Sequence, residues 1–101
     1  MKTYAFRLYI TAESIHSQNA AENLRKLCRT VLGGACEIEI IDVGIHPEQA
    51  EADKILATPT LIRLRPAPPR RLIGDLSDMR RVLVALGLQN LLSSQQGDDN
   101  E

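Results

Sequence analysis

Alternation of apolar and polar positions predicts two strands in the N-terminal half of the chain. Residues Tyr4–Ile10 alternate and are rich in aromatic and β-branched side chains, as expected for a strand with one buried face. That face carries Phe6, Leu8 and Ile10. The second segment, Cys36–Val43, begins with alternation and then becomes apolar on both sides, which indicates a strand that enters a core.

A helix is predicted between these two strands. Apolar residues recur there at helical spacing after Ser14, whose hydroxyl group suits an N-cap. The apolar stripe consists of Ala20, Leu24, Leu27, Cys28, Val31 and Leu32. Gly33-Gly34 is expected to end the helix, because glycine takes the left-handed conformation of a helix cap without steric cost.

A second helix and a third strand follow, joined by a Thr-Pro turn. Pro47 suits the first position of a short helix, which we expect to run to about Leu56. Thr60–Arg65 alternates again. Its two faces carry Leu61 on one side and Ile62 and Leu64 on the other. Pro59 has no amide proton, which suits the start of that strand, and the weak trans preference of X-Pro bonds permits a cis bond after Thr58.

The remaining segments complete a hairpin and a closing helix. Pro66–Pro69 is too rich in proline to join a sheet or a helix, so we expect a turn there, followed by a short strand at Arg71–Ile73. Ser77 is the predicted N-cap of the last helix. The apolar side chains of that helix are Met79, Val82, Leu83 and Leu86. Residues 88–92 are a candidate extension of it.

The order of elements is β-α-β, a helix, then β-β-α, and it predicts an α/β domain with a thioredoxin-like arrangement. A right-handed βαβ unit followed by a hairpin and a closing helix is typical of that fold. A cis proline conventionally starts its third strand, where Pro59 stands, so the fold favours a cis bond there. We expect the domain to span residues 1–92 and the acidic, polar residues 93–101 to form a disordered tail.

Composition limits the classes of partner. The chain has 101 residues, which suits one domain with a small core, and its net charge is −1. Acidic side chains gather in residues 37–51 and arginines in residues 63–81. Two faces of opposite sign favour protein partners or self-association over nucleic acid. No apolar run approaches the roughly 20 residues that span a bilayer, and no signal-peptide pattern is present, so we expect a cytoplasmic protein that does not bind membranes.

The pattern brings no catalytic or metal-binding side chains together. A thioredoxin-type enzyme needs a low-pKa cysteine at the N-terminus of the first helix, and that position reads Glu13–Ser17. Cys28 lies on the apolar stripe and Cys36 begins a strand, so both are interpreted as core residues. His16 and His46 are placed in separate turns and suggest neither a metal site nor an acid-base pair. We therefore expect no enzyme activity, no cofactor and no metal.

Two long motifs resemble those of the KaiB family. The first is Asp53–Leu61, which reads DKILATPTL, and the second runs from the proline turn through Arg70–Ser77, which reads RRLIGDLS. KaiB proteins carry DKILATPTL, a triple-proline turn and RRIIGDLS. Shorter matches at Arg7–Ile10 and Ile40–Val43 extend the likeness over nearly the whole chain. The chain is therefore identified as a member of the KaiB family, either a circadian clock KaiB or a paralogue.

The resemblance implies a non-catalytic regulator with two folds, acting in a circadian or stress-related signalling system. KaiB proteins form an oligomeric ground state, typically a tetramer, whose C-terminal half is folded differently. A rare thioredoxin-like monomer binds the ring of the ATPase KaiC, can sequester KaiA and competes with a histidine kinase. The implied partners are a KaiC-like ATPase, KaiA, the competing kinase and, in a tetrameric or dimeric ground state, further copies of this chain. We expect the thioredoxin-like fold here, with the ground-state fold as the alternative.

The resemblance also indicates particular residues. Carried over by position, Glu48, Asp53 and Lys54 in the helix before the Thr-Pro turn are expected to contact KaiC, and Glu48 replaces a family glutamine. The residues implied in fold switching and in its proline turn are Pro59, Pro66, Pro68, Pro69, Ala85 and Gly87. The segment from Ala85 to Gly87 stands where the family has Gly-Leu-Asp. Gaining alanine and gaining glycine shift helix propensity by about 1 kcal/mol in opposite directions, so the balance of folds stays open.

Two other functions remain as alternatives. One is a stand-alone sensory or protein-interaction module that resembles the N-terminal domain of the clock-associated histidine kinase. The other is a thioredoxin-like enzyme, which the missing CxxC motif disfavours.

Overall fold

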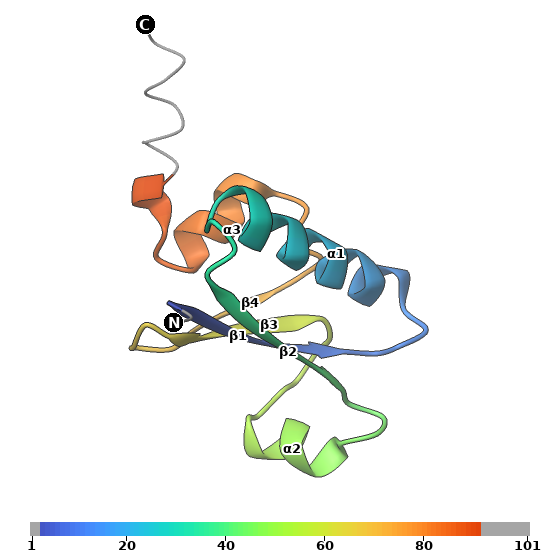
Figure 1. The fold of residues 1–101 in the computed structure, drawn as a ribbon. Coiled ribbons are helices and arrows are strands. Elements are labelled where there is room, and N and C mark those ends of the chain that lie inside the picture. Colours follow the sequence, from blue (N-terminus) through green and yellow to red (C-terminus); the bar gives the residue numbers. More distant parts are fainter. Residues whose placement is uncertain (1–2, 92–101) are drawn as a thin grey trace, which may run out of the picture.

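The computed structural model describes residues 3–91, and their elements follow the predicted order (Figure 1). The strands are β1 (Tyr4–Ile10), β2 (Cys36–Asp42), β3 (Thr60–Arg65) and β4 (Arg70–Ile73). The helices are α1 (Ile15–Thr30), α2 (Pro47–Ala52) and α3 (Met79–Ala85). The predicted tail, residues 93–101, lies outside the described residues.

A mixed sheet with strand order β2-β1-β3-β4 forms the middle layer of the molecule. β1 pairs with β2 in parallel and with β3 antiparallel, and β4 pairs antiparallel with β3. The parallel pair is connected by α1, which completes the expected βαβ unit. α1 and α3 cover one face of the sheet, and α2 lies against the other (Figure 1).

The two faces of the sheet bury separate apolar clusters. The larger lies under α1 and α3 and includes Phe6, Leu8 and Leu61. The smaller lies under α2 and consists of Tyr9, Ile41, Ala50 and Ile62. Leu61 and Ile62 therefore face opposite sides, as the alternation predicts. Since α2 has only 6 residues, it covers only part of its face.

Most of the predicted boundaries agree with the structure. The Ser14 side chain caps α1 by accepting a hydrogen bond from the Ser17 amide, as predicted. β2 ends at Asp42 and β4 begins at Arg70, each one residue from the prediction. The Thr58-Pro59 bond is cis, as the fold favours, and the Arg65-Pro66 and Ala67-Pro68 bonds are cis as well.

The second helix is shorter than predicted. It ends at Ala52 and not near Leu56, because Lys54 takes a left-handed conformation with φ 56° and turns the chain away from the helix axis. Leu56 consequently lies in a loop.

Both ends of the last helix also differ from the prediction. The N-cap is Asp78, whose carboxylate accepts from the Arg81 amide, and not Ser77. The helix ends at Ala85, because Gly87 has φ 73°, and residues 89–91 form a separate helical turn and not a continuation of α3. Leu92, the last residue of the predicted extension, lies outside the described range.

Candidate functional site

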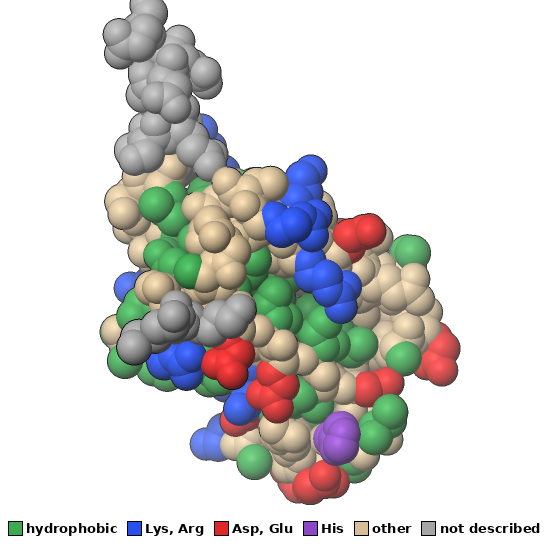
Figure 2. All heavy atoms as spheres, viewed as in Figure 1, with side chains coloured by type: hydrophobic (Ala, Val, Ile, Leu, Met, Phe, Trp, Pro, Cys, Tyr) green, Lys and Arg blue, Asp and Glu red, His purple; other side chains and the backbone are tan. Residues whose placement is uncertain are grey.

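Residues 45–58 comprise α2, the two residues before it and the loop after it, and we call this segment the α2 tip. It lies below the strands in Figure 1, on the face of the sheet opposite α1 and α3. Figure 2, drawn from the same side, shows acidic, histidine and hydrophobic side chains together at the surface of this region. Two of the three predicted partner contacts, Glu48 and Lys54, are exposed on it, and the Glu48 side chain is 78% accessible.

A Schellman motif ends α2. The Lys54 amide donates to the Glu51 carbonyl at 3.0 Å, and the Ile55 amide donates to the Ala50 carbonyl at 2.9 Å. The residue in the left-handed position of this motif is usually glycine, because a side chain there costs about 1 kcal/mol. Here it is Lys54, so the lysine is held in a defined and unfavourable backbone conformation.

The third predicted contact, Asp53, points inward. Its carboxylate accepts from the Tyr9 hydroxyl at 2.5 Å and from Arg7 Nη1 at 3.1 Å. The Tyr9 hydrogen bond and the nearby Arg7 guanidinium lower the pKa of Asp53 below its ordinary value. Burial, followed by the Asp53 hydrogen bond, raises the pKa of Tyr9 to about 12. Asp53 therefore anchors the α2 tip to β1, and its half-buried side chain, 28% accessible, is less exposed than that of Glu48.

The α2 tip also exposes hydrophobic side chains that the sequence did not indicate. Leu56 is 94% accessible and Ile45 is 69% accessible. A shallow hollow of about 240 Å³ lies beside Leu56. It is lined by Val43, Ala50, Ile55, Leu56, Ala57 and Thr58. The hydrophobic pattern assigned Leu56 to a helix end, so only the observed turn at Lys54 brings it to the surface.

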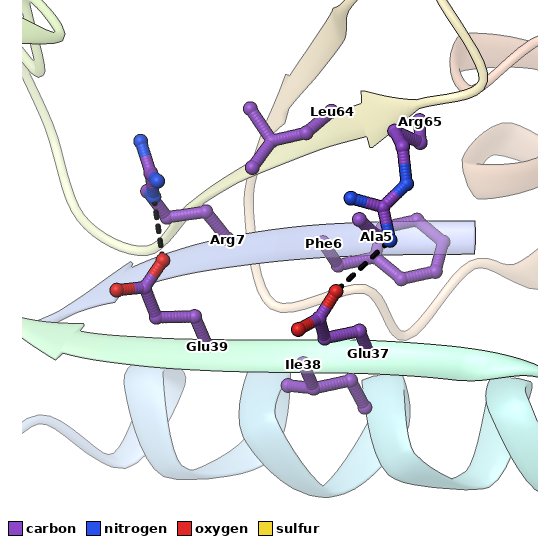
Figure 3. A pocket seen from close by; sticks show the side chains of 8 residues that line it. All are labelled: Ala5, Phe6, Arg7, Glu37, Ile38, Glu39, Leu64 and Arg65. Carbon is purple, nitrogen blue, oxygen red and sulfur yellow. Dashed lines mark hydrogen bonds and ion pairs between the residues drawn. The ribbon is translucent and has the colours of Figure 1, made fainter. Parts of the chain in front are cut away.

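A second hollow, of about 430 Å³, lies on the part of the same sheet face that α2 does not cover (Figure 3). Arg7 pairs with Glu39 and Arg65 with Glu37 across it, both at 2.9 Å. The Arg65–Glu37 pair joins the acidic and the arginine-rich stretches of the sequence, and Arg7 of β1 neutralises a second acidic side chain, Glu39. The separation of charge that the sequence suggested is thus partly cancelled within the sheet.

The residues assigned to fold switching lie mainly at the other end of β3. Pro59 is buried immediately before that strand. Pro66, Pro68 and Pro69 are exposed in the turn after it, while Ala85 and Gly87 mark the end of α3.

One arginine joins this turn to the end of α3. Arg63 is only 5% accessible, and its guanidinium donates to the Leu86 carbonyl and, at 2.8 Å, to the Pro68 carbonyl. A Cβ at Gly87 would lie 3.1 Å from Arg70 Nε and 3.4 Å from Arg63 Nη1. The left-handed Gly87 therefore also gives room to two guanidinium groups.

Hydroxyl groups occupy the N-terminus of α1, where a thioredoxin-type enzyme would carry its cysteines. The Ser17 hydroxyl accepts from the Thr11 amide at 3.0 Å, and the Thr11 and Thr58 hydroxyls lie 2.7 Å apart. Cys28 and Cys36 are buried in the larger apolar cluster, as predicted.

The two histidines are placed apart. His16 lies in the first turn of α1, not in the preceding turn as predicted, and its Nδ1 is 3.9 Å from the Asp75 carboxylate. His46 precedes α2, and its Nδ1 is 4.0 Å from the Glu48 carboxylate. Between residues 3 and 91, no three His, Cys, Asp or Glu side chains gather as metal ligands. None of the helices in that range is both long and apolar enough to cross a membrane.

Comparisons with known proteins identify the family. The KaiB domain model matches residues 7–88. The circadian clock oscillator protein KaiB of Synechococcus sp. (strain RCC307) is 44% identical over 99 residues, which cover 98% of this chain and 87% of that protein. The circadian clock protein KaiB3 of a Synechocystis strain is 44% identical over 88 residues, covering 87% and 86% of the two chains.

Solved structures show the same fold. The N-terminal domain of Synechococcus elongatus SasA superposes with a TM-score of 0.70 at 21% identity, over 93% of this chain and 87% of that one. Chloroplastic thioredoxin z gives a TM-score of 0.71 at 16% identity, over 88% and 80%. At such low identity these structures show a thioredoxin-like fold and nothing further. Because the KaiB domain model matches residues 7–88 and KaiB proteins are 44% identical over most of its length, the chain belongs to the KaiB family.

Proposed function

We propose that this chain is a non-catalytic clock regulator that binds a KaiC-type ATPase ring through the α2 tip, in the cytoplasm. The observation that carries the proposal is the form of the tip itself. Asp53, bonded to Arg7 and Tyr9, fixes a short helix and loop to the sheet, while Lys54, Glu48 and Leu56 remain exposed. A rigid, exposed surface with an apolar side chain among charges loses little conformational entropy on binding.

The names of the relatives support a role in the clock. The curated relatives are circadian clock proteins, and this chain covers most of their length. The fold shared with the SasA N-terminal domain supports a further part of the proposal, in which the two proteins compete for one surface of the ATPase. KaiA is the other proposed partner, engaged after the ATPase complex has formed.

Replacing Lys54 with glutamate tests the binding surface. Charge reversal at an exposed position should weaken binding to a purified KaiC-type ATPase by about tenfold, since like charges across an interface oppose association. Isothermal titration calorimetry gives the Kd, and the circular dichroism spectrum should stay unchanged.

The matched control for this test is Lys26→Glu. Lys26 is also exposed but lies on α1, on the other side of the sheet, and carries the same change of charge. Equal affinities of Lys54→Glu and the unsubstituted protein would overturn the assignment of this surface. A loss shared equally by both variants would indicate a general charge effect instead.

The proposal includes a second, oligomeric state with a different C-terminal half. Ala85 lies at the last position of α3, where it favours helix over the family's glycine, and Gly87 ends that helix. We expect the protein to populate both a thioredoxin-like monomer and a tetramer or dimer, in proportions that change with concentration. Native mass spectrometry together with backbone NMR across a concentration series measures both. A monomer with β shifts at residues 60–65 and 70–73 at every concentration would contradict the switch.

The alternative of a stand-alone sensory module rests on the structural likeness to the SasA N-terminal domain. Such a module would bind the same kind of ATPase without forming a tetramer or dimer. The same mass measurement therefore separates the two functions.

A further inference from the structure

A side chain from the far edge of the sheet reaches the end of α2. Arg71 lies on β4, and its Nη2 donates to the Asp53 carbonyl at 2.8 Å while Nη1 lies 3.4 Å from the Lys54 carbonyl. These two carbonyls belong to the C-cap of α2 and to the left-handed residue after it. A cation that bonds the last carbonyls of a helix stabilises that end of the helix.

The α2 tip is thus held from two strands that lie far apart in sequence. β1 fixes the Asp53 side chain through Arg7 and Tyr9. β4 fixes the Asp53 and Lys54 backbone through Arg71. The contacts from β1 fix the position of the end of α2. The contacts from β4 act on the backbone of Lys54, and the conformation of that backbone sets the direction of the lysine side chain.

The contact from Arg71 depends on the register of β4. Arg71 pairs with Ile62, whose side chain belongs to the cluster under α2, so both residues face the α2 side of the sheet. Since side chains alternate along a strand, a slip of one residue would turn Arg71 to the opposite face. Its neighbours cannot take its place, because Arg70 approaches Gly87 and Leu72 is buried in the larger cluster under α1 and α3.

From this geometry we infer that Arg71 is a positioning residue for the partner-binding surface: it holds Lys54 in its left-handed conformation only while β4 is paired in register with β3. The consequence for partner affinity rests on the proposed function. The effect of Arg71 on the conformation of the α2 tip is independent of the proposed function.

Arg70 supplies a matched control. It is the preceding residue on β4, carries the same charge and is also exposed, but it approaches the end of α3 and not the α2 tip. Arg71→Met and Arg70→Met therefore make the same change in net charge. Methionine keeps the apolar stem of each side chain and removes the guanidinium group.

The first measurement uses the free protein and no partner. In Arg71→Met, the backbone NMR resonances of Lys54, Ile55 and Leu56 should shift, and their amides should exchange with solvent about tenfold faster. In Arg70→Met the resonances and the amide exchange rates of these three residues should stay unchanged. Arg71→Lys should shift these resonances and accelerate exchange less than Arg71→Met does, because an ammonium group can still donate to one carbonyl. A general loss of stability would raise exchange throughout the sheet, so acceleration confined to the α2 tip identifies positioning.

The second measurement is the Kd for a purified KaiC-type ATPase. We expect Arg71→Met to bind about fivefold to tenfold more weakly, and Arg70→Met to bind within twofold of the unsubstituted protein. Unchanged resonances and exchange in Arg71→Met would overturn the positioning role. Altered resonances with unchanged affinity would show that Arg71 positions the α2 tip but that this positioning does not affect binding of the ATPase. If the unsubstituted protein does not bind the ATPase at all, the proposed function fails, and the NMR result still decides the role of Arg71.

Discussion

At the scale of single residues, neighbouring positions take opposite roles at the end of α2. Asp53 and Lys54 are adjacent and were both predicted as partner contacts, yet the carboxylate turns inward and the lysine is exposed. The reason is the left-handed conformation at Lys54, which reverses the direction of the chain. The sequence could not indicate this, because glycine is the usual signal for such a turn and lysine is not.

The Tyr9–Asp53 pair predicts a dependence of stability on pH. Asp53 has a folded-state pKa below the ordinary 3.8, so its contribution is present above about pH 4 and is lost as the pH falls through the folded pKa. Tyr9 has its pKa raised from 10.0 to about 12, so its contribution is complete below pH 10 and is lost as the pH rises toward 12. Tyr9→Phe should lower the free energy of unfolding by about 1–2 kcal/mol near pH 7.

Urea denaturation across the pH range checks this prediction. The difference in the free energy of unfolding between the unsubstituted protein and Tyr9→Phe should be constant from pH 5 to 9. It should become smaller below pH 4 and above pH 10. Tyr4→Phe is the control, because Tyr4 stacks on Phe6 at 6.4 Å between ring centroids and lies outside the Asp53 network. A difference that does not change with pH would show that the hydrogen bond is not the cause.

At the scale of elements, the type and order of helices and strands follow from hydrophobic spacing, but their ends depend on local capping. Ser77 and Asp78 are both good N-cap residues, so the sequence alone could not choose between them. The choice is made by the preceding turn, in which the Ser77 amide donates to the Asp75 carboxylate and the Asp78 carboxylate accepts from Arg81.

Capping of α3 gives a prediction with a built-in control. Asp78→Ala should lower the free energy of unfolding by about 1 kcal/mol, because the Arg81 amide loses its acceptor. Ser77→Ala should change it by less than about 0.5 kcal/mol, since it is the Ser77 backbone, and not its hydroxyl, that bonds Asp75. Thermal and urea unfolding of both variants measure the difference. The reverse ranking would restore Ser77 as the functional cap.

At the scale of the whole molecule, the sequence predicted the layers and not the links between them. The alternation of Leu61 and Ile62 is local, and it correctly assigned the two faces of β3. The contact between Arg71 and the end of α2 joins residues that are far apart in sequence, and only the paired sheet brings them together. The family motifs indicated that both regions matter, but no spacing rule could show that they touch.

The exposed leucine of the α2 tip sets the thermodynamic character of any complex formed there. Covering Leu56 and Ile45 removes apolar surface from water, which lowers the heat capacity of the system. The enthalpy of association should therefore become more negative as the temperature rises.

Raising the salt concentration should slow association, because ions screen the charged side chains of the α2 tip. The dissociation rate should change little, because burial of apolar surface is not screened by ions.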